Sequence, residues 1–444
     1  MTGVRPGLPE GPYLVVGLAR SGIAAALALR ARGEEVIGLD RGAPGGLEGL
    51  VAAGVDLHLD SEGTELLARA RSVVKSPGVP SSAAVIVAAR GRGIPVLGEL
   101  ELGWRMLTNE FIAVTGTNGK TTTVALIESM HRQAGLPVAM AGNVGIALSS
   151  LARAVDPGAT IVCEASSFQL EDTVDFAPEA AVLLNLSPDH LDRHRTFEEY
   201  RMAKLEIFAR QGNDDVAVAP LGLGVEDLGG CARRVCFGSG PEAALSEEAG
   251  QLWWDERPLL ALSELRLRGR HNVQNAMAAA AVCLARGIEE DAVRDGLRTF
   301  AGVAHRLEEV ARSEGVLFVN DSKATNVAST LVALRSFDGD GAIHLILGGQ
   351  GKGQDFTALK DPVERSCAAV YLIGEDAPVI AAALAGARTD VRMCGELERA
   401  VREASAAAVA GQVVLLSPAC ASFDQFADFE ARGERFRTLV LERS

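Results

Sequence analysis

Short apolar runs alternate along the chain with longer segments whose apolar positions recur at helical spacing. Most of the short runs end in a glycine, an acidic residue or a polar turn. This alternation predicts an α/β fold, in which mainly parallel sheets are covered by helices. We expect strands over residues 13–17, 35–40, 111–115, 160–165, 180–186, 316–320, 342–349, 368–374 and 413–419.

The alternating pattern falls into three blocks, from which we predict three domains. Residues 1–98 form the first, and residues 99–302 form a central domain that closes with helices over 271–287 and 289–300. Residues 303–444 form the third. A chain of 444 residues suits this division, because domains average ~150 residues.

One predicted helix, in RTFEEYRMAKLEIFAR, carries a cation on its apolar face. Thr196 and Glu199 have the spacing of a capping box, and Gly212 is expected to end the helix. Lys204 then lies in mid-helix, one turn from Tyr200. The local pattern alone favours an ordinary surface lysine whose stem lies along the apolar face.

Composition changes the interpretation of Lys204. Of the 43 basic residues only six are lysines, and four of these lie in motif-like segments, at positions 120, 204, 323 and 352. Since arginine serves elsewhere as the surface cation, we infer that these positions need an amine, either as a compact donor or as a reactive nitrogen.

The net charge of −15 argues against a broad basic face for nucleic acid or anionic lipid, so we expect neither partner. Seven cysteines without a Cys-x-x-Cys pair indicate reduced thiols and a cytoplasmic protein. Residues 13–29 are apolar, but polar and charged residues at 20–22 interrupt them, which argues against a signal peptide or a membrane span. We expect a soluble monomer.

The segment TGTNGKTT, residues 115–122, follows one predicted strand and opens a helix. Its glycines allow backbone N–H groups to surround a triphosphate, Lys120 can reach the phosphates, and Thr121 can bind Mg²⁺. It departs from the full P-loop pattern at Val114, which replaces the first glycine. Glu164 ends another predicted strand and can complete the Mg²⁺ shell.

Two other motifs leave alternatives open. GLARSG with Asp40 is close to a dinucleotide fingerprint but has Ala19 in place of the second glycine, so a structural turn and a nucleotide site are equally consistent with it. In LNLSPDHLDRH, Asp189, His190, Asp192 and His194 fall within six positions, as a metal site or a solvated loop would place them.

Polar turns follow several strands of the third block. VNDSKATN, GGQGKGQDF and LSPACASFDQF end three strands, and upstream lie HNVQN and AHRLEE. Because the carboxyl ends of parallel strands meet at one edge, these turns predict a small-molecule site.

Together these segments resemble the Mur ligases of peptidoglycan synthesis, over all three blocks. TGTNGKTT, HNVQN, AHRLE and LSPACASFDQF resemble the wider family, while NDSKATN and SSFQLE resemble its D-glutamate-adding branch. The resemblance implies Rossmann-like first and third domains and a P-loop ATPase-like central domain. It implies ligation of D-glutamate to UDP-N-acetylmuramoyl-L-alanine with ATP, through an acyl phosphate.

The resemblance also implies a set of site residues. The UDP-sugar would contact Arg20, Ser21, Gly22, Asp40, Arg41, Ser76 and Asn143. ATP would contact Gly116, Thr117, Asn118, Gly119, Lys120, Thr121, Thr122, Asn272, Asn275, Arg306 and Asp321. Two Mg²⁺ ions would be bound by Thr121 and Glu164 and by His190 and Lys204, with Lys120, His190 and Lys204 serving catalysis. D-Glutamate would contact Lys323, Thr325, Lys352, Ser422 and Phe423.

In this family the lysine that matches Lys204 is carboxylated by CO₂, which replaces a cation with a metal-binding carbamate. Three rival functions remain beside the D-glutamate ligase. A sibling ligase would add another amino acid, an NAD-dependent oxidoreductase would use GLARSG and Asp40, and a P-loop regulatory switch would hydrolyse ATP without forming an amide.

Overall fold

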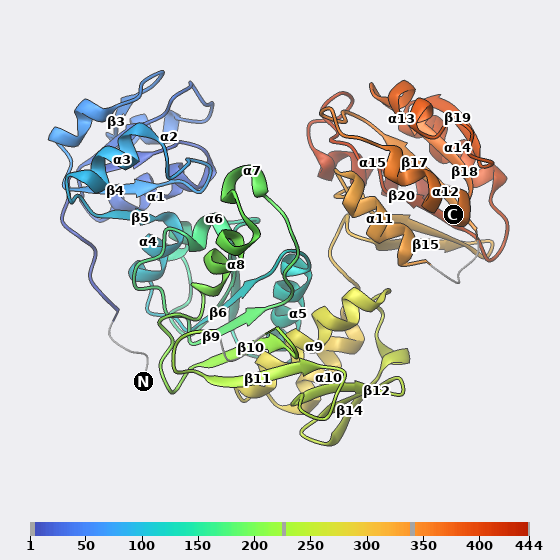
Figure 1. Cartoon of the computed structure of the whole chain (residues 1–444), viewed down its shortest axis with the longest axis horizontal. Helices are drawn as coiled ribbons and strands as arrows, with labels where there is room; N and C mark the ends of the chain where they lie inside the picture. Colours follow the sequence, from blue (N-terminus) through green and yellow to red (C-terminus); the bar gives the residue numbers. More distant parts are fainter. Residues whose placement is uncertain (1–4, 224–227, 338–341, 443–444) are drawn as a thin grey trace. The chain divides into compact units, whose positions relative to one another are not determined.

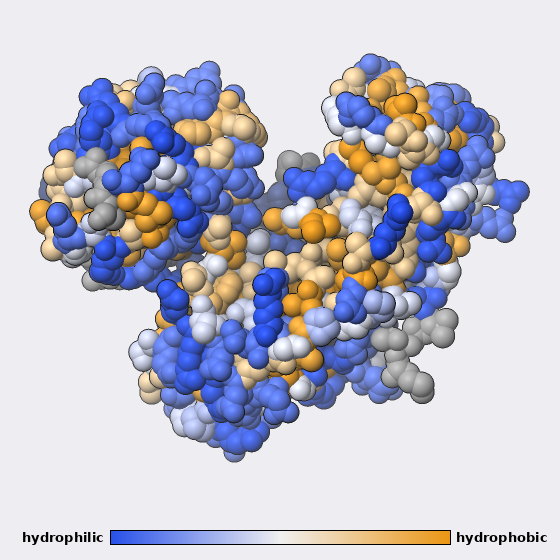
Figure 2. Space-filling view, turned by 180° about the vertical axis from the view of Figure 1, so that it is seen from behind, coloured by the Kyte–Doolittle hydropathy of each residue, from blue (hydrophilic) through white to orange (hydrophobic). Residues whose placement is uncertain are grey.

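The structure, a computed structural model, describes residues 5–223, 228–337 and 342–442, except for the side chains of residues 191 and 192. Contacts between residues divide the chain into two compact units. The first comprises residues 1–265 and 274–299, and the second comprises residues 266–273 and 300–444. Figure 1 shows sheets with flanking helices in both units, and on the face drawn in Figure 2 hydrophilic side chains dominate the surface.

The first unit contains a small, fully parallel sheet with the strand order β3-β2-β1-β4-β5. Its strands are β1 (Tyr13–Val16), β2 (Val36–Leu39), β3 (Asp56–His58), β4 (Ser72–Lys75) and β5 (Val96–Gly98). Apolar residues of α1 (Arg20–Ala31), α2 (Glu48–Ala52) and α4 (Glu99–Met106) cover one face. Those of η1 (Thr64–Ala68) and α3 (Ala84–Gly91) cover the other. The strand order reverses between β1 and β4, where ligands of such sheets bind.

The larger sheet of this unit has the order β14-β13-β12-β11-β10-β9-β6-β8-β7. Its strands are β6 (Phe111–Thr115), β7 (Val138–Gly142), β8 (Thr160–Glu164), β9 (Ala180–Leu183), β10 (Val216–Pro220), β11 (Arg233–Gly238), β12 (Leu245–Glu248), β13 (Gln251–Trp254) and β14 (Arg257–Ala261). Pairing is parallel as far as β12, and the β12–β14 meander is antiparallel.

The helices and 3₁₀ turns around this sheet are α5 (Lys120–Gln133), η2 (Leu148–Arg153), α6 (Ser167–Leu170), α7 (Leu191–His194), α8 (Phe197–Leu205), η4 (Leu262–Glu264), α9 (Arg270–Ala285) and α10 (Glu290–Thr299). Gly296 of α10 lies against Met130 of α5, where an added Cβ would come within 2.9 Å of the Met130 Cα. This close contact fixes the helix that follows the glycine loop.

The second unit contains a sheet with the order β15-β16-β20-β17-β18-β19, parallel except at β15. Its strands are β15 (Glu308–Ser313), β16 (Val316–Asn320), β17 (Ile343–Gly348), β18 (Cys367–Ile373), β19 (Asp390–Gly395) and β20 (Val413–Leu416). One face packs against α11 (Val327–Arg335), η5 (Thr357–Leu359), α12 (Lys360–Ser366) and α13 (Ala377–Ala383). The other packs against α14 (Leu397–Ala407) and α15 (Phe429–Leu441). The prediction of three mainly parallel sheets is confirmed.

The expected helix around Lys204 is partly wrong. α8 ends at Leu205, well before Gly212, because the next residues form tight turns that direct Ile207 and Phe208 into the core. Lys204 therefore lies in the last turn of α8 and not in mid-helix.

The expected capping box is half formed. Thr196 Oγ1 accepts from Glu199 N at 3.1 Å, but the Glu199 carboxylate pairs with Arg195 at 3.0 Å. Among the helices that the structure describes, none has the length and apolarity needed to cross a membrane.

Candidate active site

Four neighbouring parallel strands bring the polar segments of the larger sheet to one edge. β6 lies between β8 and β9, and β7 lies beside β8. β6 leads into residues 115–122, β8 ends at Glu164, and Asn143 and Asn185 lie just beyond β7 and β9. Since the carboxyl ends of parallel strands share an edge, Thr117 and Ser187, 70 positions apart, meet there.

Two glycines give the loop between β6 and α5 its shape. Gly116 has φ +152° and Gly119 has φ +88°, values that side chains with a Cβ rarely adopt. A Cβ on Gly119 would lie 2.1 Å from Asn275 Oδ1, so Asn275 of α9 lies directly against the loop. The Asn185 side chain accepts from Asn118 N at 2.9 Å and donates to Asn118 O at 3.0 Å, which holds the middle of the loop.

A hydroxyl and a carboxylate meet beside this loop. Thr121 Oγ1, in the first turn of α5, donates to Glu164 Oε2 at 2.8 Å. Asn143 Nδ2 donates to the other carboxylate oxygen, Oε1, at 2.9 Å. This oxygen-rich arrangement fits Mg²⁺, which binds one or two carboxylate or hydroxyl groups together with substrate phosphates. The glycine loop and the backbone N–H groups at the start of α5 fit a phosphate chain.

Two lysines converge on the same backbone oxygen. Lys120 Nζ and Lys204 Nζ donate to Gly116 O at 2.9 Å and 2.8 Å. Lys204 is buried, and its ammonium lies 4.6 Å from the centre of the Tyr200 ring. Burial, and then the charge of Lys120, lower the pKa of Lys204 to about 7. Tyr200 in turn donates to Thr117 Oγ1 at 3.0 Å, so α8 is fixed to the loop.

Of the four acidic and histidine residues of LNLSPDHLDRH, the three whose side chains the structure describes do not converge as a metal site. The His190 side chain is half-exposed beside Asp189, whereas His194 is buried and shares a hydrogen bond of 2.9 Å with Ser167 Oγ. Burial lowers the pKa of His194. The Asp192 side chain lies outside the described residues. In the part of the chain that the structure describes, no three His, Cys, Asp or Glu side chains are placed to bind a metal.

Asp40, which follows β2, accepts hydrogen bonds from two backbone N–H groups. Its Oδ2 accepts from Leu18 N at 2.6 Å and its Oδ1 from Gly42 N at 2.9 Å. Ser76 Oγ donates to Gly17 O at 2.7 Å, which joins the loop after β4 to the loop after β1. Of the other residues predicted here, Arg20, Ser21 and Gly22 open α1, and Arg41 follows β2.

In the second unit, the loops after β16, β20 and β17 leave neighbouring strands at one edge. Asp321 follows β16 and is buried, accepting from Ser417 Oγ at 2.8 Å and from Leu307 N at 3.1 Å. Burial raises the pKa of Asp321 to about 7.

The same edge carries the residues predicted for D-glutamate. Lys352 Nζ lies 5.8 Å from the Phe423 ring centre, and the exposed Phe423 follows β20. Lys323 Nζ lies 5.6 Å from the Phe429 ring centre. Ser422 Oγ is buried and has no hydrogen-bond partner among the described residues. A buried polar atom without a partner is costly, so Ser422 is a candidate ligand-binding group.

The remaining predicted residues divide between the units. Asn272 belongs to the second unit and Asn275 to the first. Asn272 Nδ2 donates to Arg268 O at 2.7 Å. Arg306 is near enough to Asp321 to oppose the rise of its pKa. Thr325 N donates to Lys323 O at 2.9 Å within the NDSKATN loop.

Arg432 shapes this edge, although its sequence context gave no sign of it. The buried guanidinium of this α15 residue donates from Nη2 to Ser322 O at 2.9 Å and to Cys420 O at 3.0 Å, and from Nε to Ser322 Oγ at 3.0 Å. Burial lowers the pKa of Arg432 to about 10. The residue joins the NDSKATN and LSPACASFDQF loops, whose sequence distance hides the connection.

Comparisons with known proteins give one consistent result. Family models match residues 12–98 as a Mur ligase MurD-like N-terminal domain, residues 114–229 as a Mur ligase middle domain, and residues 305–420 as a Mur ligase glutamate ligase domain. The chain is similar to the UDP-N-acetylmuramoylalanine--D-glutamate ligase of Anaeromyxobacter dehalogenans, with 42% identity over 97% of each chain. That of Acidobacterium capsulatum is 40% identical over 96% of this chain and 95% of its own.

Solved structures support the fold. UDP-N-acetylmuramate-alanine ligase from Thermotoga maritima matches 98% of this chain and 100% of its own, with a TM-score of 0.62 and 18% identity. UDP-N-acetylmuramoylalanyl-D-glutamyl-2,6-diaminopimelate--D-alanyl-D-alanyl ligase from Acinetobacter baumannii gives 0.60 and 16% identity over 97% of this chain and 93% of its own. At these identities the likeness concerns the fold.

Asp321 predicts a pH dependence of stability. Its pKa is about 7 in the folded chain against 3.8 for an ordinary aspartate, so its contribution is complete below 3.8 and is lost as the pH rises through about 7. We therefore expect the free energy of unfolding of Asp321→Asn to fall below that of wild type by the largest amount in mild acid and by the smallest amount near neutral pH. Urea unfolding without ligands from about pH 5 to about pH 8 measures this difference. Asp361→Asn, at an exposed position of α12, is the control. A loss of stability that is independent of pH for Asp321→Asn would contradict the assignment.

Proposed function

The chain belongs to the Mur ligase family, and from this premise we propose that it joins D-glutamate to UDP-N-acetylmuramoyl-L-alanine with hydrolysis of ATP, a cytoplasmic step of peptidoglycan precursor synthesis. The observation that carries the proposal is the pairing of Thr121 with Glu164 beside a glycine loop, in a chain similar over nearly its whole length to D-glutamate ligases. We propose a monomer.

Each proposed domain has one part in this reaction. Residues 1–98 would bind the UDP group, residues 99–302 would bind ATP, and residues 303–444 would bind D-glutamate. The strand-end loops at the edge of each sheet support these assignments, because ligands of parallel sheets bind there.

The proposed reaction has two steps. The alanyl carboxylate attacks the γ-phosphorus of ATP, the bond from that phosphorus to the ADP oxygen breaks, and an acyl phosphate forms. The amine of D-glutamate then attacks the acyl carbon, which forms the amide, expels phosphate and releases a proton from nitrogen. The enzyme's task is to hold the reactants and neutralise the moving charge.

The residues of the glycine loop are suited to that task. Lys120 and the N–H groups of the loop would bind the phosphates, and Thr121 and Glu164 would hold a Mg²⁺ ion, which would withdraw charge from the phosphate oxygens. Asn143 would keep the Glu164 carboxylate oriented. Asn275, which contacts Gly119, would lie beside the nucleotide phosphates.

For Lys204 we propose conversion to a carbamate. Its neutral amine would attack CO₂, form an N–C bond and lose a proton, leaving an anion suited to a second Mg²⁺ with His190. Two observations support this role. Lys204 Nζ is buried beside Gly116 O, where a permanent cation would lie close to the charge of Lys120. In the described structure Lys204 donates to this carbonyl oxygen and to no carboxylate. A guanidinium cannot react in this way.

In the second unit, Ser422 is the proposed group with the clearest structural support. Its buried hydroxyl has no partner among the described residues and can hydrogen-bond a carboxylate of D-glutamate. Lys352 and Lys323, each beside an aromatic ring at the same edge, would supply the positive charge for the amino acid's carboxylates. Arg306 and Asp321 would contact the nucleotide.

Phosphate release tests the function directly. With ATP, Mg²⁺ and UDP-N-acetylmuramoyl-L-alanine, we expect release that depends on D-glutamate and not on L-glutamate, L-alanine, L-lysine or diaminopimelate. A preference for another amino acid would make the chain a sibling ligase. Release that needs no amino acid would indicate a nucleotide switch, and NADH-dependent chemistry would indicate the oxidoreductase.

From the proposed carbamate we expect Lys204→Ala to be at least about a hundredfold slower than wild type, because the variant lacks this anionic ligand of the second Mg²⁺. A short carboxylic acid such as formate should restore part of the rate by taking the place of the carbamate. Lys360→Ala, a lysine outside the proposed site, should keep the wild-type rate with or without formate. Wild-type activity of Lys204→Ala without added acid would refute the role.

Ser422→Ala is expected to raise the KM for D-glutamate by roughly tenfold, since one hydrogen bond to a charged group is worth about 1.5–3 kcal/mol. Its melting temperature should not fall, because the hydroxyl makes no bond within the described chain. Ser417→Ala is the matched control: it breaks hydrogen bonds to Asp321 and Thr330 and should lower the melting temperature. An unchanged KM in Ser422→Ala would exclude the contact.

A further inference from the structure

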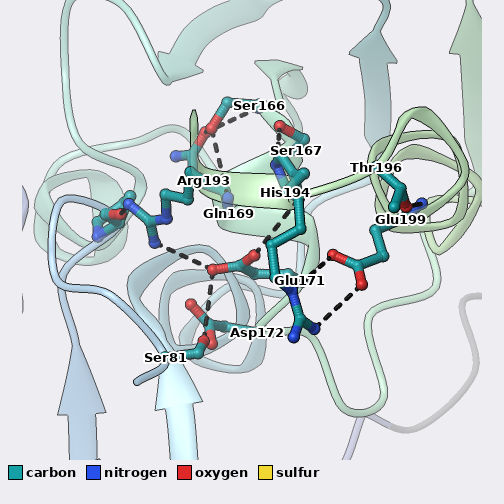
Figure 3. A network of polar contacts seen from close by, with 12 residues as sticks. Ser81, Ser166, Ser167, Gln169, Glu171, Asp172, Arg193, His194, Thr196 and Glu199 are labelled. Carbon is teal, nitrogen blue, oxygen red and sulfur yellow. Dashed lines mark hydrogen bonds and ion pairs between the residues drawn. The ribbon is translucent and has the colours of Figure 1, made fainter. Parts of the chain in front are cut away.

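Arg193 connects two loops of the first unit that lie far apart in the sequence. Its Nη1 donates to Pro77 O at 2.8 Å, and its Nη2 donates to Val79 O at 3.0 Å and to Glu171 Oε1 at 3.0 Å. The guanidinium also lies 4.2 Å from the centre of the Phe168 ring. Figure 3 shows Arg193 directed at Glu171. The planar guanidinium of Arg193 donates to three acceptors and stacks on an aromatic ring, and lysine has no planar group that could do the same.

The loop that Arg193 holds is a wall of the proposed UDP site. Ser76 Oγ donates to Gly17 O at 2.7 Å, and a Cβ added to Gly17 would lie 2.7 Å from Val79 Cγ2. Residues 76–79 therefore pack directly on the glycine turn before α1. The carbonyl oxygens of Pro77 and Val79 in this segment accept from Arg193.

At its other end Arg193 belongs to the loop that carries His190. Arg193 N donates to His190 O at 3.1 Å. The centre of the Phe168 ring lies 4.9 Å from that of His190 and 5.2 Å from that of His194. His194 is fixed by its hydrogen bond to Ser167. The short helix α7, which carries Arg193, is thus held to α6 through Ser167 and Phe168, so Arg193 can act as an anchor for residues 76–79.

A network of ion pairs, buried at Lys75 and Asp172, supports this anchor. Glu171 also accepts from Ser81 at 3.4 Å (Figure 3). It pairs with Lys75 at 3.6 Å. Lys75, the last residue of β4, is fully buried and forms its closer ion pair with Asp172. Arg90 of α3 pairs with Asp172 at 3.4 Å. Every charged group of the network is paired, as burial requires.

We propose that Arg193, a residue of the central domain, is a positioning residue for the sugar-nucleotide substrate. It holds residues 76–79 in the shape that the UDP group meets, with Glu171 as its charged partner. This inference rests on the proposed function for the identity of the ligand. It assigns part of the substrate affinity of the first domain to a side chain that belongs to another domain.

Equilibrium binding tests the inference without turnover. We expect Arg193→Gln to bind UDP-N-acetylmuramoyl-L-alanine, and UDP alone, about tenfold more weakly in calorimetry, through the loss of two or more hydrogen bonds to the loop. Affinity for a non-hydrolysable ATP analogue with Mg²⁺ should stay at the wild-type value. Arg193→Lys, which keeps the charge without the fork, should recover little of the loss.

Arg195→Gln is the matched control, because this neighbouring arginine is 82% exposed and pairs with Glu199 outside the network. It should bind both ligands as wild type does. Glu171→Gln, which leaves Arg193 an acceptor but removes the charge, should give a smaller loss of UDP affinity than Arg193→Gln and provides a second variant if Arg193→Gln does not fold.

Two results would overturn the inference. One is equal binding of UDP by wild type and both network variants, and the other is an equal loss of UDP and ATP-analogue binding, which would indicate general damage. If wild type binds the sugar nucleotide but releases no phosphate with D-glutamate, the proposed function fails while the role of Arg193 remains measurable.

Discussion

Parallel pairing of β6 with β8 and β9 is the constraint on which the candidate site depends. It places the glycine loop, Glu164 and Asn185 at one edge, where hydrogen bonds between their side chains and the loop fix its conformation. A slip of one residue in either pairing would turn these side chains to the opposite face. The apolar strands that set the register are therefore also what position the polar site.

Buried cations recur wherever loops of this chain must be joined. Lys204 donates to the glycine loop, Lys75 pairs with Asp172 beneath the first-domain turn, and Arg432 binds the carbonyls of two loops in the second unit. Burying a charge is costly unless it is paired or hydrogen-bonded. Lys75 and Arg432 have such partners, whereas burial and the charge of Lys120 lower the pKa of Lys204. Arg193 follows the same rule at the rim of the proposed UDP site. The loops are held by specific polar contacts, whereas the sheets beneath them are held by apolar packing.

The sequence predicted those parts of the molecule that local pattern determines. Strands, the glycine loop and the strand-end position of Glu164 follow from apolar runs and from short motifs, and all are found. The end of α8 was placed too late, because the turn after Leu205 is decided by the burial of Ile207 and Phe208 and not by the next glycine. Arg432 could not be found, since Ser322 lies 110 residues away. Arg193 was missed because two of its three acceptors are backbone oxygens, which carry no residue-specific signal.

The central claim is that the alanyl carboxylate of the sugar nucleotide is activated as an acyl phosphate before D-glutamate attacks it. Turnover of UDP-N-acetylmuramoyl-L-alanine labelled with oxygen-18 in both carboxylate oxygens tests this most directly, with mass analysis of the released phosphate. The account predicts one labelled oxygen in each phosphate and one in the new amide. Unlabelled phosphate, formed at the same rate as the amide, would contradict it.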